Sequence, residues 1–228
     1  MTSGSVKSLL AKANRLVKNK DFSAAQKIYN SILSQYPSNQ EAKKALENLI
    51  TIENNKSNVP IELIQKISNY YSKGNFREAF EMIEKAHFEY KINHLLLNIK
   101  GAIYSKNRDD QKALDSFEKS IQIEPYAGET HNARGFALFR LNLFDEAELA
   151  FRRALELNPN NSAVYNNLGV LLLECDRLED AKICFESAIQ QKGDYYEAYI
   201  HLGNVLQKMD KVPEATECYE RAVIINPN

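Results

Sequence analysis

The sequence repeats itself at a constant interval. Residues 94–127, 128–161, 162–195 and 196–228 align with one another without a gap. One column of this alignment contains only glycine, a second contains only alanine, and a third contains only aromatic residues. A constant period of 34 residues predicts an array of similar units, each of which buries its apolar side only against its neighbours. The three columns are Gly101, Gly135, Gly169 and Gly203; Ala113, Ala147, Ala181 and Ala215; and Phe117, Phe151, Phe185 and Tyr219.

Each unit has the pattern of two amphipathic helices joined by a short polar turn. Apolar residues recur at helical spacing in both halves, and a proline or glycine follows the second half. Glycine is about 1 kcal/mol less favourable than alanine inside a helix, so Gly169 in the apolar segment 162–174 needs a compensating gain. Helices approach to about 8–10 Å only where their side chains are small. We therefore expect Gly169 to lie at a close helix crossing, opposite Ala181 and Ala188, with Phe185 filling the gap to the neighbouring repeat.

These columns resemble the tetratricopeptide repeat, which carries glycine, alanine, aromatic, alanine and proline residues at corresponding positions. The resemblance covers four consecutive copies between residues 94 and 228. It implies an all-α fold, a right-handed superhelical solenoid of helix-turn-helix repeats, for which we expect about 13 helices in this chain. It also implies that the first helix of each repeat lines a concave surface, which the family uses to bind peptides.

Two less regular repeats precede the four, which gives about six in all. Residues 60–93 keep Ala79 but have Ile67 in the glycine column, and residues 6–37 keep Ala25. The step from Ala25 to Ala79 is longer than one repeat, and the surplus at 38–58 contains a short amphipathic pattern that we interpret as a capping helix. An enlarged turn within one array is the alternative. We predict an N-terminal unit with its cap at residues 1–55 and an array of five repeats at 60–228, namely 60–93, 94–127, 128–161, 162–195 and 196–228.

The last repeat has no predicted helix after it. Its second helix would leave Tyr219, Ala222, Val223 and Ile225 without a neighbouring repeat. Either another molecule covers this side, or the chain is the front part of a longer protein, which is the interpretation we favour here.

Asparagines recur at one position of the first helices and predict a binding groove. Asn98, Asn132 and Asn166 occupy the same column in three successive repeats. An amide side chain can pair with both the C=O and the N–H of a peptide unit. Helices about 10 Å apart would place one asparagine beside roughly every third residue of an extended peptide. The alternative is that these amides are solvated or connect neighbouring helices. The other predicted groove residues are Asn167, Phe136, Phe139, Val170, Leu173, Arg140, His201 and Asn204.

Two subclasses of the family can be compared with this predicted groove. One subclass holds acidic chaperone tails with a clamp of lysine, asparagine and arginine, and the columns here carry Asn, Ala, Phe, Val and Ile instead of the cations. A chaperone-tail role is therefore not expected. The segment AVYNNLG at 163–169 is similar to repeats of protein-modifying N-acetylglucosamine transferases, in which an asparagine ladder holds acceptor peptides.

No pattern in the chain predicts catalysis or a cofactor. The four histidines are dispersed without Asp, Glu or Cys at metal-ligand spacing, and no phosphate loop or nucleophile motif is present. Three cysteines in no metal-type pattern fit reduced, packed thiols. A net charge of −1 gives no reason to expect nucleic acid, and no stretch has the apolar length to span a bilayer. We therefore predict a non-enzymatic cytoplasmic protein with no metal or cofactor and no membrane span.

Three functions remain compatible with the sequence. The first is a protein-protein interaction scaffold that binds an extended peptide or a partner helix in the groove. The second is the partner- or substrate-recruiting N-terminal region of a larger enzyme, such as a glycosyl-, sulfo- or methyltransferase. The third is self-association through the uncapped C-terminal repeat. Residues 1–55 carry eight basic and four acidic side chains, which we interpret as a solvated basic face, with a docking site for an acidic partner as the alternative.

Overall fold

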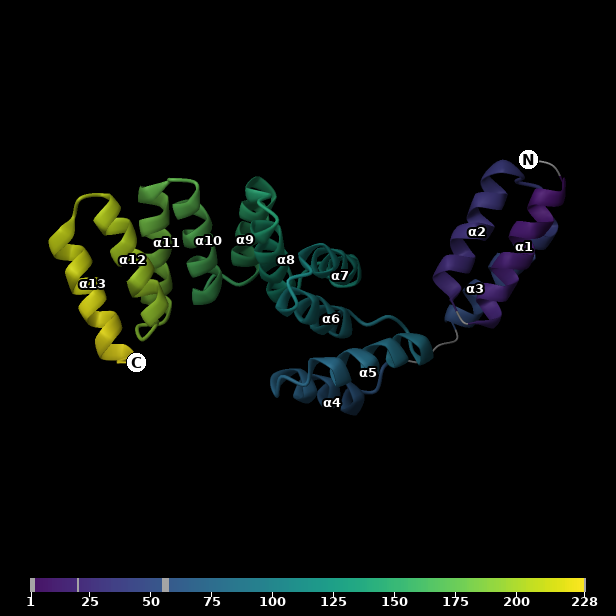
Figure 1. Ribbon diagram of the computed structural model, residues 1–228, viewed down its shortest axis with the longest axis horizontal. Helices are drawn as coiled ribbons and strands as arrows, with labels where there is room; N and C mark the ends of the chain where they lie inside the picture. The colour runs from purple at the N-terminus through teal and green to yellow at the C-terminus, as the bar shows by residue number, and fades with distance from the viewer. Residues whose placement is uncertain (1–2, 20, 55–57, 228) are drawn as a thin grey trace. The chain divides into compact units, whose positions relative to one another are not determined.

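The protein is all-α, as the sequence predicts. A computed structural model describes residues 3–19, 21–54 and 58–227, and this part of the chain forms 13 helices and no strand (Figure 1). The number of helices agrees with the expected one. The helices are α1 (Ser3–Lys18), α2 (Phe22–Gln35), α3 (Gln40–Asn54), α4 (Ile61–Ser72), α5 (Phe76–Glu89), α6 (His94–Lys106), α7 (Asp110–Ile123), α8 (Gly128–Arg140), α9 (Phe144–Leu157), α10 (Ser162–Glu174), α11 (Leu178–Gln191), α12 (Tyr196–Lys208) and α13 (Val212–Ile225).

The chain divides into two compact units, residues 1–93 and residues 94–228. In the first unit α1, α2 and α3 share one core, which includes Leu10, Tyr29, Ala42 and Leu49, and α4 packs against α5. The second unit contains four consecutive helix pairs, α6 to α13, each of which is one repeat. The grouping of residues 60–93 with these four repeats stays a prediction.

In residues 60–93 and in each of the four later repeats, the turn between the two helices contains one residue in the left-handed conformation. Arg108, Asn142, Asp176 and Asp210 stand at the same position of successive repeats and have φ values of 64°, 60°, 57° and 60°. Gly74 stands at the equivalent position of an earlier repeat with φ 79°. Glycine, asparagine and aspartate are the residues that tolerate this conformation best, so four of the five turns use a suitable residue and Arg108 is the exception.

The glycine column allows each helix pair to enclose an aromatic ring. A Cβ atom built on Gly169 would lie 2.6 Å from Cε1 of Phe185, and the equivalent distances at Gly101, Gly135 and Gly203 are 2.5, 2.7 and 2.5 Å. The close crossing that the sequence predicts is therefore present. Its partner is different from the expected one, because the ring of Phe185 lies over Gly169, whereas Ala181 and Ala188 were expected there.

Residues 60–93 have a different pair of residues at these two positions. Ile67 occupies the glycine position and Ile83 the aromatic position of residues 60–93, and both side chains are fully buried. A larger residue on the first helix therefore comes with a smaller one on the second. Residues 6–37 have Ala13 and Tyr29 at the same two positions, so the total volume of the pair differs between the repeats.

Candidate binding face on the A helices

The first helices of the four repeats, α6, α8, α10 and α12, are called the A helices, and α7, α9, α11 and α13 the B helices. Each B helix packs against the A helix of its own repeat, and α7, α9 and α11 also pack against the next A helix. Successive A helices approach one another along residues 94–228, whereas successive B helices make no comparable approach in the described chain. An array with its A helices closer together curves toward them, so the A helices form the inner side of this unit.

One stripe of residues on the A helices forms what we call the A-helix face. Positions are counted from the first residue of each repeat, which is residue 94, 128, 162 or 196. Positions 2, 5 and 9 share one side of the A helix because they are three and four residues apart. Three large apolar side chains on this stripe are exposed: Leu95 on α6 and Phe136 on α8 by 40% each, and Ile200 on α12 by 38%. Phe136 was among the predicted groove residues, and Ile200 stands in the same predicted groove column as Asn98, Asn132 and Asn166. Leu95 shares its column with Glu129, Ala163 and Glu197, so the column gave no common signal.

The asparagine ladder connects neighbouring A helices. Nδ2 of Asn98 on α6 donates a hydrogen bond of 2.7 Å to Oγ1 of Thr130 on α8, and Thr130 is buried. Nδ2 of Asn167 on α10 donates a bond of 3.0 Å to Oδ1 of Asn132 on α8. Three of the predicted groove amides therefore hold one repeat against the next, which is the alternative that the sequence left open for them. The hydroxyl of Thr130 had not been singled out.

Asn166 lies in the same column but is largely enclosed. Its side chain is 8% exposed, and its Oδ1 atom is buried without a hydrogen-bond partner among the described residues. Oδ1 of Asn98 is buried and unpaired in the same way, although Nδ2 of Asn98 has Thr130 as its partner. Asn166 lacks that second partner as well, because the place that Thr130 takes relative to Asn98 is taken by Ala198 relative to Asn166. The methyl group of Ala198, which is fully buried, offers no hydrogen bond. An unsatisfied buried acceptor costs about 1–3 kcal/mol, so Asn166 is a strained member of the ladder.

Arg140 was expected to be a cation at the rim of the groove, and the structure gives it a different environment. Its Nη2 lies 3.0 Å from Oδ2 of Asp110, and the two side chains are only 14% and 12% exposed. Its Nη1 donates a hydrogen bond of 2.9 Å to the backbone oxygen of Ser105. The guanidinium also lies 5.8 Å from the ring centroid of Phe136. Its charge is therefore paired within the protein, and Arg140 orients the exposed ring of Phe136.

The other predicted apolar groove residues support the core of this unit. Phe139, Val170 and Leu173 are partly buried and pack against the cluster of residues that α7 to α13 enclose. The ring centroid of Phe139 lies 5.9 Å from that of Phe144, the first residue of α9. These three side chains form the base under the A-helix face, and Phe136 stands above it.

The last two predicted groove residues, His201 and Asn204, belong to α12. The ring of His201 stacks on Phe185 of α11 with centroids 5.3 Å apart. Burial lowers the pKa of His201 below its usual value, and Glu197 partly opposes this effect. Oδ1 of Asn204 accepts a hydrogen bond of 2.9 Å from the hydroxyl of Tyr219. Tyr29 and Asn14 form the same pair in the first repeat, with an oxygen–oxygen distance of 2.6 Å.

The described residues contain no group of three or more His, Cys, Asp or Glu side chains that could hold a metal ion. In the same part of the chain, every helix lacks either the length or the apolar run that a bilayer crossing requires. Burial raises the pKa of the Cys184 thiol to about 11, which keeps it in the unreactive neutral form at physiological pH.

Family models match most of the chain. Models described as tetratricopeptide repeat match residues 128–161 and 196–228 and, in a further case, residues 150–183. A model described as pentatricopeptide repeat-containing protein matches residues 4–120, slightly more than half of the chain.

Solved structures with the same fold are remote in sequence. MamA is 22% identical with a TM-score of 0.63, and the match covers 71% of this chain and 94% of MamA. PilF from Pseudomonas aeruginosa is 19% identical with a TM-score of 0.67, and the match covers 72% of this chain and 75% of that one. YrrB, which is described as a TPR protein with an unusual peptide-binding site, is 22% identical with a TM-score of 0.59, and the match covers 82% of this chain and 92% of YrrB.

Proposed function

The chain belongs to the tetratricopeptide repeat family, and from this premise we propose that residues 94–228 hold an extended segment of a protein partner on the A-helix face. One observation carries the proposal: large apolar side chains on three of the four A helices, Leu95, Phe136 and Ile200, are each close to 40% exposed. Exposed apolar residues that share one face are typical of partner-binding surfaces. The description of YrrB as having a peptide-binding site supports the same kind of function.

The spacing of these side chains sets the kind of segment that fits. Adjacent A helices are about 10 Å apart, and an extended chain advances about 3.3 Å per residue. Leu95 and Phe136 are also seven repeat positions, or about 10 Å, apart along the helix axis. A segment crossing the A helices would therefore place one apolar side chain on Leu95, another roughly four to five residues later on Phe136, and a third roughly six residues after that on Ile200. Phe136 is the central anchor because aromatic residues near the middle of an interface contribute most to affinity.

The charges beside the stripe point away from an acidic segment. Arg140 is already paired with Asp110, and Glu129 and Glu197 lie on the same face of α8 and α12. An acidic peptide would meet carboxylates on two helices and find the guanidinium occupied. The proposed partner is therefore an apolar or mildly basic extended segment of another protein.

A selection experiment tests this proposal without knowledge of the natural partner. Random dodecapeptides displayed on phage are selected on the full chain, and the enriched peptides are titrated against two variants. Phe136→Glu should weaken binding by at least about a hundredfold, because it removes a central aromatic contact and buries a charge. Leu149→Glu is the matched control, because Leu149 is 68% exposed on the B helix α9. Peptides that bind both variants as well as the original protein would refute the A-helix face as the binding site.

A further inference from the structure

The last helix, α13, carries a hollow on its surface. Its volume is about 450 Å³. Two of the side chains around it, Val223 and Ile224, are 62% and 70% exposed. A single helix with this much exposed apolar surface is the usual state of a B helix before the next A helix covers it. The lining residues are Thr216, Tyr219, Glu220, Val223 and Ile224.

The contact between α7 and α8 shows how such a surface is covered in this chain. α7 carries Phe117 followed by Glu118, and α13 carries Tyr219 followed by Glu220 at the same two positions of the repeat. Oε1 of Glu118 lies 3.5 Å from Nη2 of Arg134 on α8. Arg134 is the seventh residue of its repeat. A helix that covers α13 in the same register would therefore bring the residue equivalent to Arg134 next to Glu220, and a basic residue there would form the same ion pair.

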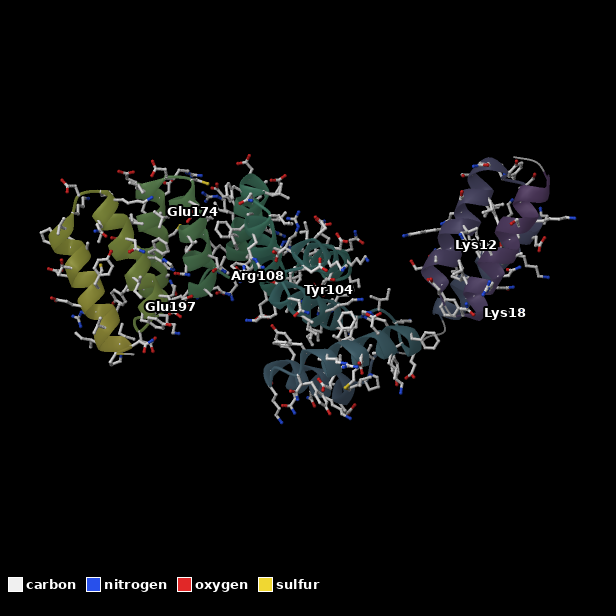
Figure 2. All side chains as sticks on the ribbon, viewed as in Figure 1. Lys12, Lys18, Tyr104, Arg108, Glu174 and Glu197 are labelled. Carbon is white, nitrogen blue, oxygen red and sulfur yellow. The ribbon has the colours of Figure 1, made fainter. Side chains whose placement is uncertain are left out.

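The helix of this chain that best repeats the contact side of α8 is α1. Its Lys12 occupies the position of Arg134, and Ala11 occupies that of Ala133, which in α8 packs against the core with Phe117. Lys12, labelled in Figure 2, is exposed. The residues that correspond are Ser8, Ala11, Lys12 and Leu16 on α1 and Thr130, Ala133, Arg134 and Leu138 on α8.

The charges of the two helices are opposite. α1 carries Lys7, Lys12, Arg15 and Lys18 and no acidic residue. α13 carries three glutamates, at positions 214, 217 and 220, and one basic residue, Arg221. Two copies of α13 would bring like charges together, whereas α13 and α1 attract each other, so the charges favour α1 as the occupant of the hollow.

We propose that α13 of one copy of this protein binds α1 of a second copy, in the register in which α7 binds α8. Lys12 of the second copy then pairs with Glu220, and its Ala11 lies over the ring of Tyr219. The interface joins two different surfaces of the same chain, so the association is heterologous and continues head to tail rather than ending at a dimer. This assembly is independent of the A-helix face and of any peptide that the face binds.

Charge exchange tests both the partner and the register. Sedimentation velocity of the full chain without an added tag is measured over a dilution series that reaches the millimolar range. Lys12→Glu and Glu220→Lys should each weaken self-association by at least about tenfold, since each places like charges together at the contact. The double variant should associate again, and so should a mixture of the two single variants, because each then offers the other a complementary surface. The matched control is Glu217→Lys, the same charge change on the same helix outside the hollow, which should stay within about twofold of the original protein.

Several results would overturn the proposal. A protein that remains monomeric throughout the series does not assemble in this way. Association that both single exchanges leave unchanged excludes α1 and α13 as the contact, and an equal effect of Glu217→Lys and Glu220→Lys excludes the proposed register. Single variants that fail to recover association when they are mixed would show that Lys12 and Glu220 do not pair across the contact. Circular dichroism of each variant confirms that the exposed substitutions leave the fold intact.

Discussion

Substituting Gly169 by alanine should destabilise the protein although alanine is the better helix former. The added Cβ would lie 2.6, 2.8 and 2.9 Å from three atoms of the Phe185 ring. Phe185 is fully buried, and its ring is rigid, so the contact can be relieved only if α10 and α11 move apart. Both helices are held by neighbouring repeats on either side. Overpacking of this kind costs about 1–3 kcal/mol, and we expect the upper end of that range here.

The helix propensity of alanine offsets part of this cost. It returns about 1 kcal/mol, so the net loss of unfolding free energy should be about 2 kcal/mol. For a chain of this size, a loss of that magnitude lowers the melting temperature by about 4–8 °C. Ala13 shows that alanine can stand beside an aromatic residue, Tyr29, in the first repeat, where both are almost fully buried. That pair belongs to α1 and α2, and α1 has a packing partner on one side only among the described helices.

Guanidinium unfolding followed by circular dichroism measures the effect, with unchanged m-values required for the comparison. Gly193→Ala is the matched control, because a Cβ there meets no atom within 4 Å and the variant should be neutral or slightly stabilised. Phe185→Leu shortens the opposing side chain, so the double variant Gly169→Ala/Phe185→Leu should lose less stability than the sum of the two single variants, by about 0.5–3 kcal/mol. A Gly169→Ala variant with the midpoint of the original protein would refute the reasoning.

Three further predictions follow from single residues of the second unit. Ala198→Ser should raise the unfolding free energy by about 0.5–1 kcal/mol, because the serine hydroxyl would pair with the amide of Asn166. Thr130→Val should lower the unfolding free energy by about 1–2 kcal/mol, because it removes the hydroxyl that Asn98 bonds. Chemical denaturation checks both signs. Arg108, labelled in Figure 2, has a positive φ of 64°. Arg108→Asn should stabilise the turn by up to about 1 kcal/mol, because asparagine accepts a positive φ better, and an unchanged midpoint would contradict this. The pKa of His201 is lowered in the folded state, so its contribution to stability is present above its usual pKa of about 6.5 and is lost as the pH falls through the lowered value. The melting temperature should therefore fall more on acidification in the original protein than in His201→Phe, and parallel curves would exclude the effect.

The sequence predicts the helices and their pairing because both depend on local patterns. The glycine column indicated close crossings, and the left-handed residue recurs at the same position of every repeat in the second unit. The partner of Gly169 was wrong for a physical reason. A column shows that a residue is equivalent in every repeat, but it does not show which of two facing side chains, Phe185 or Ala181, lies over the glycine. That choice depends on the angle at which the helices cross.

The candidate site was less predictable because its side chains are shared with the packing between repeats. Asn98 and Asn167 bond to residues 32 and 35 positions away, and no pattern within one repeat reveals such a partner. Arg140 looked like a rim cation because Asp110, with which it pairs, lies in the preceding repeat. A polar residue on an A helix can face the partner or the neighbouring helix, and a modest rotation of the helix about its axis decides between them.

The proposed recognition surface lies where the repeats differ from one another. The four column glycines and the rings of Phe117, Phe151 and Phe185 are buried in the same way in successive repeats and cannot discriminate between binding partners. Leu95, Phe136 and Ile200 stand at three different positions of the repeat, and in no case does the column hold the same residue in all four copies. Close packing between repeats fixes the distances between the A helices, and in the proposed function these irregular apolar residues select the partner. Selection can change such residues individually without a cost to the core, because each of them is close to 40% exposed.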